Sequence, residues 1–461
     1  MNLRRLPHAT VLKGILWLAI LLRLAGVVLN TEANDDHLTV IKVMAYQHRI
    51  PADDEFWQAY QPKLYHGTVA AVFRALPPLG NSVLVRVGQA ISCAAGIATL
   101  LILLSVLRSA PVPQRVQQLT FALTALNPKM IATSIEVTND AFVILFATIA
   151  FSAGWRFFRS PDRRQFLLMT LGAALAGVSK GNGLAVSMAL GGCFLAALCW
   201  PPAPRPRLLA YGALFVLFVG ISVSIGGQYW SRYRSTGNPF TINEAYMPPP
   251  HFLEETFVRR PGVTSVVNSF MTFRLVGMLQ DPQITNDAAI YPPHRTSFWS
   301  AVYGSMHSIH YDYFPPSWQT HNAAVRMLLR AIFLLALLPT AALVLGVWSA
   351  VATPLRKLLQ PPHRPSPEEL LIGFGAAGYL AFLLTFAYHE RDFGSMKPIY
   401  VFPGVLPFML CAAGGFERLR TGKRAHLGRW AMASGTLLCV AYVLDEAALF
   451  MQLTALRLHL I

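Results

Sequence analysis

Charged residues are scarce in this sequence of 461 residues. Lys, Arg, Asp and Glu together make up 13% of it, about half of the usual share in a soluble domain. Apolar residues make up 54%. They recur in runs of about 20 residues, which are long enough to cross a bilayer core of ~30 Å. The composition therefore argues against a set of soluble domains and predicts an all-α polytopic membrane protein.

Acidic residues are the scarcer charged group, with 22 against 38 basic residues and a formal net charge of +16. Half of the basic residues fall in six short connectors, which hold Arg4, Arg5, Lys13, Arg108, Arg115, Arg156, Arg159, Arg163, Arg164, Arg205, Arg207, Arg356, Lys357, Arg364, Arg418, Arg420, Lys423, Arg424 and Arg429. Lys and Arg gathered in the connectors of one side form the positive-inside pattern. The charge therefore predicts topology, with a cytoplasmic N-terminus, and we expect no nucleic-acid partner.

Cysteine is also rare. The five cysteines lie in apolar runs and none has the spacing of a zinc site, which argues against zinc and an external disulfide. The basic N-terminus before the first apolar run is similar to a signal peptide. No small-residue cleavage site follows, so we expect a retained first helix.

The apolar runs predict about eleven spans in a single domain, 1–461. The expected spans are 12–29, 83–107, 116–134, 140–158, 166–180, 183–200, 208–228, 325–350, 370–387, 398–416 and 430–450. Two large external segments remain, 30–82 and 229–322, and the second is the expected acceptor- or lipid-facing region. No internal repeat or low-complexity tract is present.

The first external segment carries an acidic pair where the first span leaves the bilayer. Asp35 or Asp36 would meet the headgroup of a lipid donor and act as the general base for an attacking hydroxyl. His37 beside them would contact the substrate. A solvated loop carboxylate is the alternative, and position alone does not decide between the two. On a helix the two acids would point about 100° apart, so only one is expected to face a donor, and the sequence does not select it.

The end of this segment, Gln61-Pro62-Lys63-Leu64-Tyr65-His66, contains three candidate substrate contacts. Lys63 can neutralise a phosphate as a point charge, and Tyr65 and His66 can donate hydrogen bonds to it. The alternative is a snorkelling lysine beside interfacial aromatic residues.

Later external turns supply further candidates. Asn139 and Asp140 would either contact substrate or cap a helix. Lys180 lies in Ser179-Lys180-Gly181-Asn182-Gly183, which interrupts an apolar run and would face an active cavity or form a simple turn. Arg391, Lys397 and Tyr400 belong to a densely charged turn and are candidate substrate contacts. Arg391 and Lys397 are candidates for the phosphate, although Arg391 can also pair with its acidic neighbours.

Taken together, these motifs resemble the GT-C superfamily of membrane glycosyltransferases, in the branch of protein O-mannosyltransferases and aminoarabinose transferases (family 39-like). The matching residues are Asp35-Asp36-His37 after the first span and Gln61 to His66, which corresponds to a PPLYY-like motif. Lys63 stands for its second proline and His66 for its second tyrosine. Asn139-Asp140, 179–183, the aromatic stretch 297–314 and Lys397 to Pro403 fall where the family has comparable features.

The resemblance implies transfer of a sugar, a hexose or pentose, from a polyprenyl-phosphate donor to a glycan, lipid or protein acceptor on the external face of a bacterial inner membrane. No cofactor is assigned to this transfer. A divalent metal at the acidic residues is chemically possible but is not predicted.

Two other functions remain open. A transporter or flippase of lipid-linked sugar would use the same polar residues, but transporters usually show related halves. A polysaccharide polymerase or ligase would present Arg and His in a late external loop, whereas the densest acidic stretch here is early.

Overall fold

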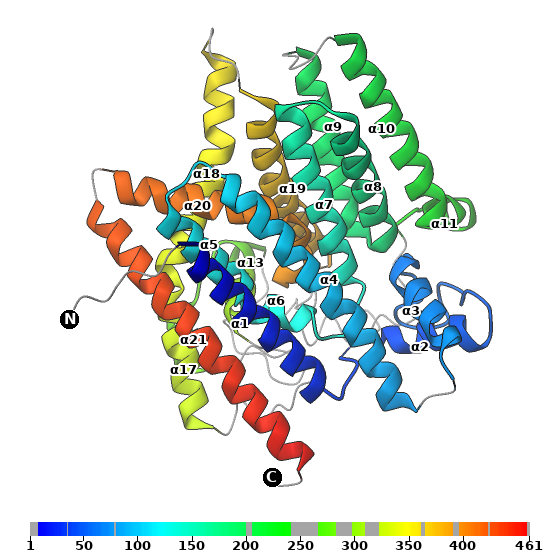
Figure 1. Ribbon diagram of the computed structural model, residues 1–461, viewed down its shortest axis with the longest axis horizontal. Helices are drawn as coiled ribbons and strands as arrows, with labels where there is room; N and C mark the ends of the chain where they lie inside the picture. Colours follow the sequence, from blue (N-terminus) through cyan, green and yellow to red (C-terminus); the bar gives the residue numbers. More distant parts are fainter. Residues whose placement is uncertain are drawn as a thin grey trace.

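The computed structural model of the protein is a bundle of helices (Figure 1). It describes residues 8–34, 36–77, 80–199, 205–240, 266–282, 297–308, 322–360, 365–390, 396–422 and 425–458, and these ranges contain no β-strand. The α-helices and 3-10 segments (η) are α1 (His8–Leu29), α2 (His37–Tyr46), α3 (Leu64–Ala75), α4 (Asn81–Ser109), α5 (Gln114–Ala125), α6 (Pro128–Thr133), α7 (Asp140–Arg159), α8 (Arg163–Ser179), η1 (Gly181–Gly183), α9 (Leu184–Cys199), α10 (Arg205–Gly226), α11 (Tyr229–Thr236), α13 (Val266–Phe270), α14 (Leu275–Gln280), α15 (Phe298–His307), α17 (Ala323–Leu335), α18 (Leu337–Leu359), α19 (Pro367–Glu390), η6 (Pro398–Gly404), α20 (Val405–Thr421) and α21 (Ala425–Arg457).

Nine helical segments in the described ranges are long and apolar enough to cross a membrane. They are His8–Leu29, Asn81–Ser109, Asp140–Arg159, Gly181–Leu198, Pro206–Gly226, Ala323–Lys357, Pro367–Tyr388, Pro398–Thr421 and Ala425–Ala455. These segments confirm the all-α polytopic membrane fold. Two of the expected spans, 116–134 and 166–180, take a different form.

The expected span 116–134 is divided into α5 and α6. Pro128 lacks a backbone N–H and disfavours helical geometry in the residue before it, so α5 ends ahead of the proline. Asn127 then caps α6, because its side chain accepts a hydrogen bond from Met130 N at 3.0 Å. The polar connector 134–139 joins α6 to α7.

The expected span 166–180 is α8, which packs beside α7. Its 17 residues give a length of about 25 Å, shorter than a bilayer core. It ends next to the Gly-rich segment 181–183, where α9 begins. α8 thus returns the chain to the end of the bundle from which α7 started.

One end of the bundle gathers the segments that carry the predicted polar residues; we call it the loop end, because α2 and α3 lie there (Figure 1). Asn139 at the start of α7 contacts Ser179 at the end of α8. Asn182 contacts Tyr400 in η6. α7 and α8 run antiparallel, so the described basic residues at their junction, Arg156, Arg159, Arg163 and Arg164, lie at the opposite end.

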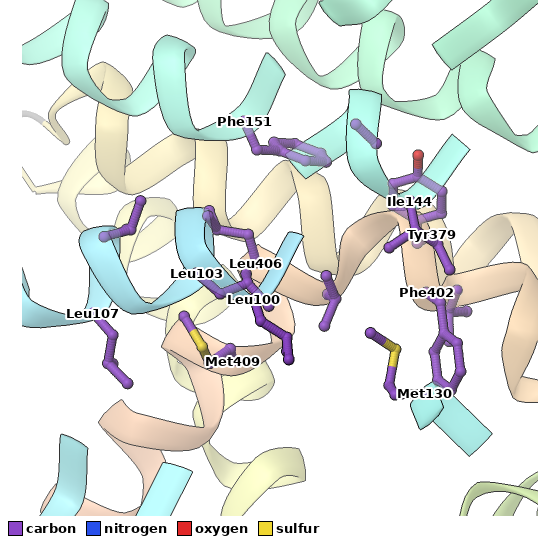
Figure 2. Close-up of a cluster of buried hydrophobic side chains, with 14 of the residues drawn as sticks. Leu100, Leu103, Leu107, Met130, Ile144, Phe151, Tyr379, Phe402, Leu406 and Met409 are labelled. Atoms are coloured by element: carbon purple, nitrogen blue, oxygen red, sulfur yellow. The ribbon is translucent and has the colours of Figure 1, made fainter. Parts of the chain in front are cut away.

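The interior between these helices is apolar (Figure 2). Leucines of α4, Phe151 of α7 and Tyr379 of α19 pack there, with Phe402 of η6 and Met409 of α20. The rings of Phe151 and Tyr379 have centroids 6.3 Å apart. Because lipid chains are as apolar as these side chains, close packing must supply much of the attraction between the helices.

Glycines allow α18 and α20 to approach closely. A Cβ added at Gly415 would lie 1.8 Å from Ala342 O, and one added at Gly346 would lie 1.8 Å from Cys411 O. Both obstacles are backbone atoms, which cannot move without displacing a helix. The neighbouring Gly414 has no atom within 4 Å of such a Cβ.

We therefore expect Gly415→Ala to destabilise the fold by about 1–3 kcal/mol, because overpacking forces backbone shifts. Gly414→Ala, in the same helix, is the matched control and should unfold like the wild type. Thermal unfolding of the detergent-solubilised protein measures both. Equal melting temperatures for the two variants would show that α18 and α20 do not pack as described.

Candidate functional site

A buried ion pair joins the start of α7 to the end of α8. Lys180 Nζ lies 2.8 Å from both carboxylate oxygens of Asp140, and the two side chains are 13% and 5% exposed. Lys180 also lies over the ring of Tyr400, 5.7 Å from its centroid. Two charges this deeply buried persist because each compensates the other. The structure thus brings together three of the predicted site residues.

Asn139 connects this pair to the first loop. Its Nδ2 donates to Ser179 O at 3.0 Å and to Gln61 Oε1 at 3.4 Å. Asn139 occupies the N-cap position of α7, but its side chain does not cap the helix. Thr138 Oγ1 accepts from Asp140 N instead, at 3.2 Å. The capping role considered for Asn139 is therefore wrong.

Two amide oxygens in this region lack a hydrogen-bond partner in the described part of the chain. They are Oδ1 of Asn139 and Oδ1 of Asn182, and both residues are almost fully buried. Asn182 Nδ2 donates to Tyr400 O at 3.2 Å, so each amide is oriented by a backbone carbonyl. A buried acceptor without a partner is costly and is normally satisfied by a further polar group.

Lys63 is buried and does not snorkel toward the surface. Its ammonium group donates to Gln61 O at 2.7 Å and to Ala59 O, so it is held by the loop that precedes α3. Burial lowers the pKa of Lys63 to about 8, with the charge of Asp53 acting in the opposite direction and that of Arg232 adding to the decrease. Lys63 is therefore a cation whose charge is sensitive to mildly alkaline pH.

Arg232 of α11 is a site residue that sequence reasoning missed. Its Nε lies 2.6 Å from Asp53 Oδ2, and its side chain is 5% exposed. Its guanidinium group also lies near the ring of Tyr229, whose hydroxyl donates to Gly177 O at 3.3 Å. An arginine just after a span, on the predicted external side, is an exception to the positive-inside pattern and could have signalled this role.

His37, Tyr65 and His66 form a buried cluster between α2, α3 and α4. His37 Nδ1 lies 2.9 Å from His66 Nε2. The hydroxyl of Tyr65 lies 3.2 Å from Gly88 O and 3.0 Å from Ser92 Oγ, and its ring packs edge-on against Phe142. These contacts fix α2 and α3 on α4. A substrate contact for these three residues remains a prediction.

The acidic pair is only partly described. Asp36 is exposed, and Thr39 Oγ1 donates to its Oδ1 at 2.7 Å at the start of α2. Asp35 and Arg391 lie outside the described residues. Lys397 is half-buried directly before η6, three residues from Tyr400. Within the described ranges, no group of three or more His, Cys, Asp or Glu side chains could hold a metal ion.

Comparison with known proteins places the central part of the chain in a family context. Residues 75–226, roughly one third of the chain, match the family model for dolichyl-phosphate-mannose-protein mannosyltransferase. The matched part contains Asn139, Asp140 and Lys180, and the first loop lies before it. No curated protein matches the chain. The match confirms, over this part of the chain, the predicted resemblance to GT-C membrane glycosyltransferases.

Proposed function

We propose that the protein transfers a sugar from a polyprenyl-phosphate donor to an acceptor at the external face of the membrane. The observation that carries the proposal is the convergence of Asn139, Asp140, Lys180 and Tyr400 with the end of the first loop. These residues come from α7, the α8–η1 junction, η6 and the segment before α3. α7 and the α8–η1 junction lie in the part of the chain that matches the mannosyltransferase family model.

The basic residues at the loop end support binding of a lipid phosphate. Lys63 and Arg232 are buried and Lys180 is half-buried, and acidic side chains balance Lys180 and Arg232. Lys63 donates to the backbone carbonyls of Ala59 and Gln61, which carry no formal charge, so its charge is the one most available to an anion. We assign Lys63 the phosphate of the donor, with Arg232 adding to the positive potential.

The two buried amide oxygens support binding of a sugar. Asn139 Oδ1 and Asn182 Oδ1 can each accept a hydrogen bond from a sugar hydroxyl, and this bond would remove the cost of leaving them unsatisfied. Carbonyls of the protein already fix the orientation of both amides. Binding of the sugar would then require little reorganisation of the site.

The chemical step is a displacement at the anomeric carbon. The acceptor oxygen forms a bond to this carbon while the bond to the phosphate oxygen breaks, and the leaving lipid phosphate takes the electron pair. The carboxylate of Asp35 or Asp36 takes the proton of the acceptor hydroxyl. Positive charge at Lys63 stabilises the charge that develops on the leaving phosphate. Attack opposite the leaving group inverts the anomeric centre.

Replacement of the base should abolish transfer. We expect Asp35→Asn or Asp36→Asn to lower kcat by at least about 100-fold, because general base catalysis contributes about 10²–10⁴-fold. The assay follows transfer of a labelled sugar from polyprenyl phosphate by the purified protein in proteoliposomes. Asp54→Asn, which changes an exposed acid in the same loop, is the matched control and should keep wild-type activity.

If both base variants kept full activity, neither aspartate would be the base. Movement of labelled lipid across the same vesicles without sugar transfer would instead indicate a flippase.

The proposed phosphate contact predicts a pH dependence. Below its pKa of about 8 Lys63 is charged, and above it the charge is lost. The donor phosphodiester stays ionised throughout, so kcat/KM for the donor should fall about tenfold between pH 7 and pH 9, since kcat/KM reports the free enzyme. In Lys63→Met, kcat/KM should be low at pH 7 and flat over this range.

Lys42→Met serves as the control, because Lys42 of α2 contacts Asn81 and no predicted site residue. It should keep the wild-type profile. A Lys63→Met profile that still fell between pH 7 and pH 9 would assign the titration to another group.

A further inference from the structure

An arginine lies inside the first membrane-spanning helix. Arg23 of α1 is fully buried, at 0% exposure. Ionisable residues inside membrane spans are expensive and usually functional, so this residue requires an explanation. It belongs to none of the contacts of the candidate site.

Arg23 holds the two ends of the interrupted segment α5–α6. Its Nη1 donates to Ala125 O at 2.9 Å, the last residue of α5, and its Nε donates to Ser134 Oγ at 3.2 Å, directly after α6. The third bond, from Nη1 to Ala19 O at 3.0 Å, fixes the side chain on its own helix. One guanidinium group thus bridges the break that Pro128 creates.

Glu446 of α21 is a second buried ionisable group near Arg23. It is buried at 1% exposure and interacts electrostatically with Arg23.

The connector 134–139 runs alongside α1 and the residues that follow it, 30–33. Ile135 packs against Gly26, where an added Cβ would come within 2.8 Å of its Cδ1. Ile135 O then accepts from Asn30 Nδ2 at 3.1 Å, and Val137 N donates to Ala33 O at 3.0 Å. Successive positions of α1 and its extension thus bind successive positions of the connector.

Gly96 of α4 lies directly against Ser134. A Cβ at Gly96 would lie 2.3 Å from Ser134 Oγ. Ser134 is therefore confined between Arg23 and α4, and the connector has little freedom to shift. The next residues along the chain are Asn139 and Asp140.

We infer that Arg23 is a positioning residue for the transfer: through Ser134 it fixes the connector that places Asn139 and Asp140 in the site. This inference rests on the proposed function. Arg23 does not touch the substrate; it acts on the site by holding the connector in place.

Ser134→Ala tests the inference without removing a buried charge. It deletes the acceptor of Arg23 Nε and leaves the bonds from Nη1 to Ala19 O and Ala125 O. We expect kcat to fall about tenfold with KM for the donor unchanged, because small misplacements of catalytic geometry are costly. Arg23→Lys keeps the charge but cannot bridge Ala125 O and Ser134 Oγ together, so it should lose more.

Thr133→Val is the matched control. Thr133 is equally buried in α6, and its hydroxyl donates to Lys129 O in its own helix. It should keep the wild-type kcat. Melting temperatures of both variants separate positioning from a general loss of stability: Ser134→Ala should lose kcat per folded molecule at a melting temperature equal to that of Thr133→Val.

Hydrogen exchange of the amides of residues 134–140, measured without substrate, gives a readout independent of activity. Exchange should be faster in Ser134→Ala and unchanged in Thr133→Val. The inference is overturned if Ser134→Ala keeps the control's kcat, or if its exchange matches that of the control. If the wild type transfers no sugar, the proposed function fails, while the exchange result still decides whether Ser134 fixes the connector.

Discussion

Backbone polar groups beside a membrane-spanning helix must find partners within the protein, and this constraint governs the connector 134–139. The chain between α6 and α7 is not helical, so its N–H and C=O groups are not paired by a regular ladder. Asn30 and Ala33, at and just after the end of α1, pair with Ile135 O and Val137 N, and Arg23 binds the side chain of Ser134. Irregular backbone is tolerated at such positions only where protein or water satisfies it. The start of α7 therefore depends on contacts made by the first helix.

The charges at the loop end are arranged largely in pairs. Asp140 is paired with Lys180, and Asp53 with Arg232. Such pairs keep the side chains in one arrangement before any ligand arrives, and fixed dipoles and charges are what stabilise a departing phosphate effectively. Lys63 differs, because backbone carbonyls hold it. The site therefore combines two ion pairs with one cation, Lys63, whose pKa is lowered by burial.

The sequence was sufficient to predict the membrane fold, but it did not predict how the candidate site residues pair. Asp140 and Lys180 are 40 residues apart, and Asn182 and Tyr400 are 218 apart, so their contacts depend on helix packing that periodicity does not encode. The division of 116–134 was foreseeable, because Pro128 lies within that run. Glu446 and Arg23 were missed because each apolar run was assessed for length, although a single charge inside a run is itself a signal.

One backbone hydrogen bond just after α1 links the segments that precede Asp36 and Asp140. Val137 N donates to Ala33 O, and each of these residues precedes an acid by three positions, Asp140 in one case and Asp36 in the other. Three residues span at most about 10 Å, so neither acid can move far from this hydrogen bond while it persists. A separation of 104 residues in sequence is thereby reduced to one backbone contact. The geometry between the first loop and the start of α7 is consequently set by the same helix that carries Arg23.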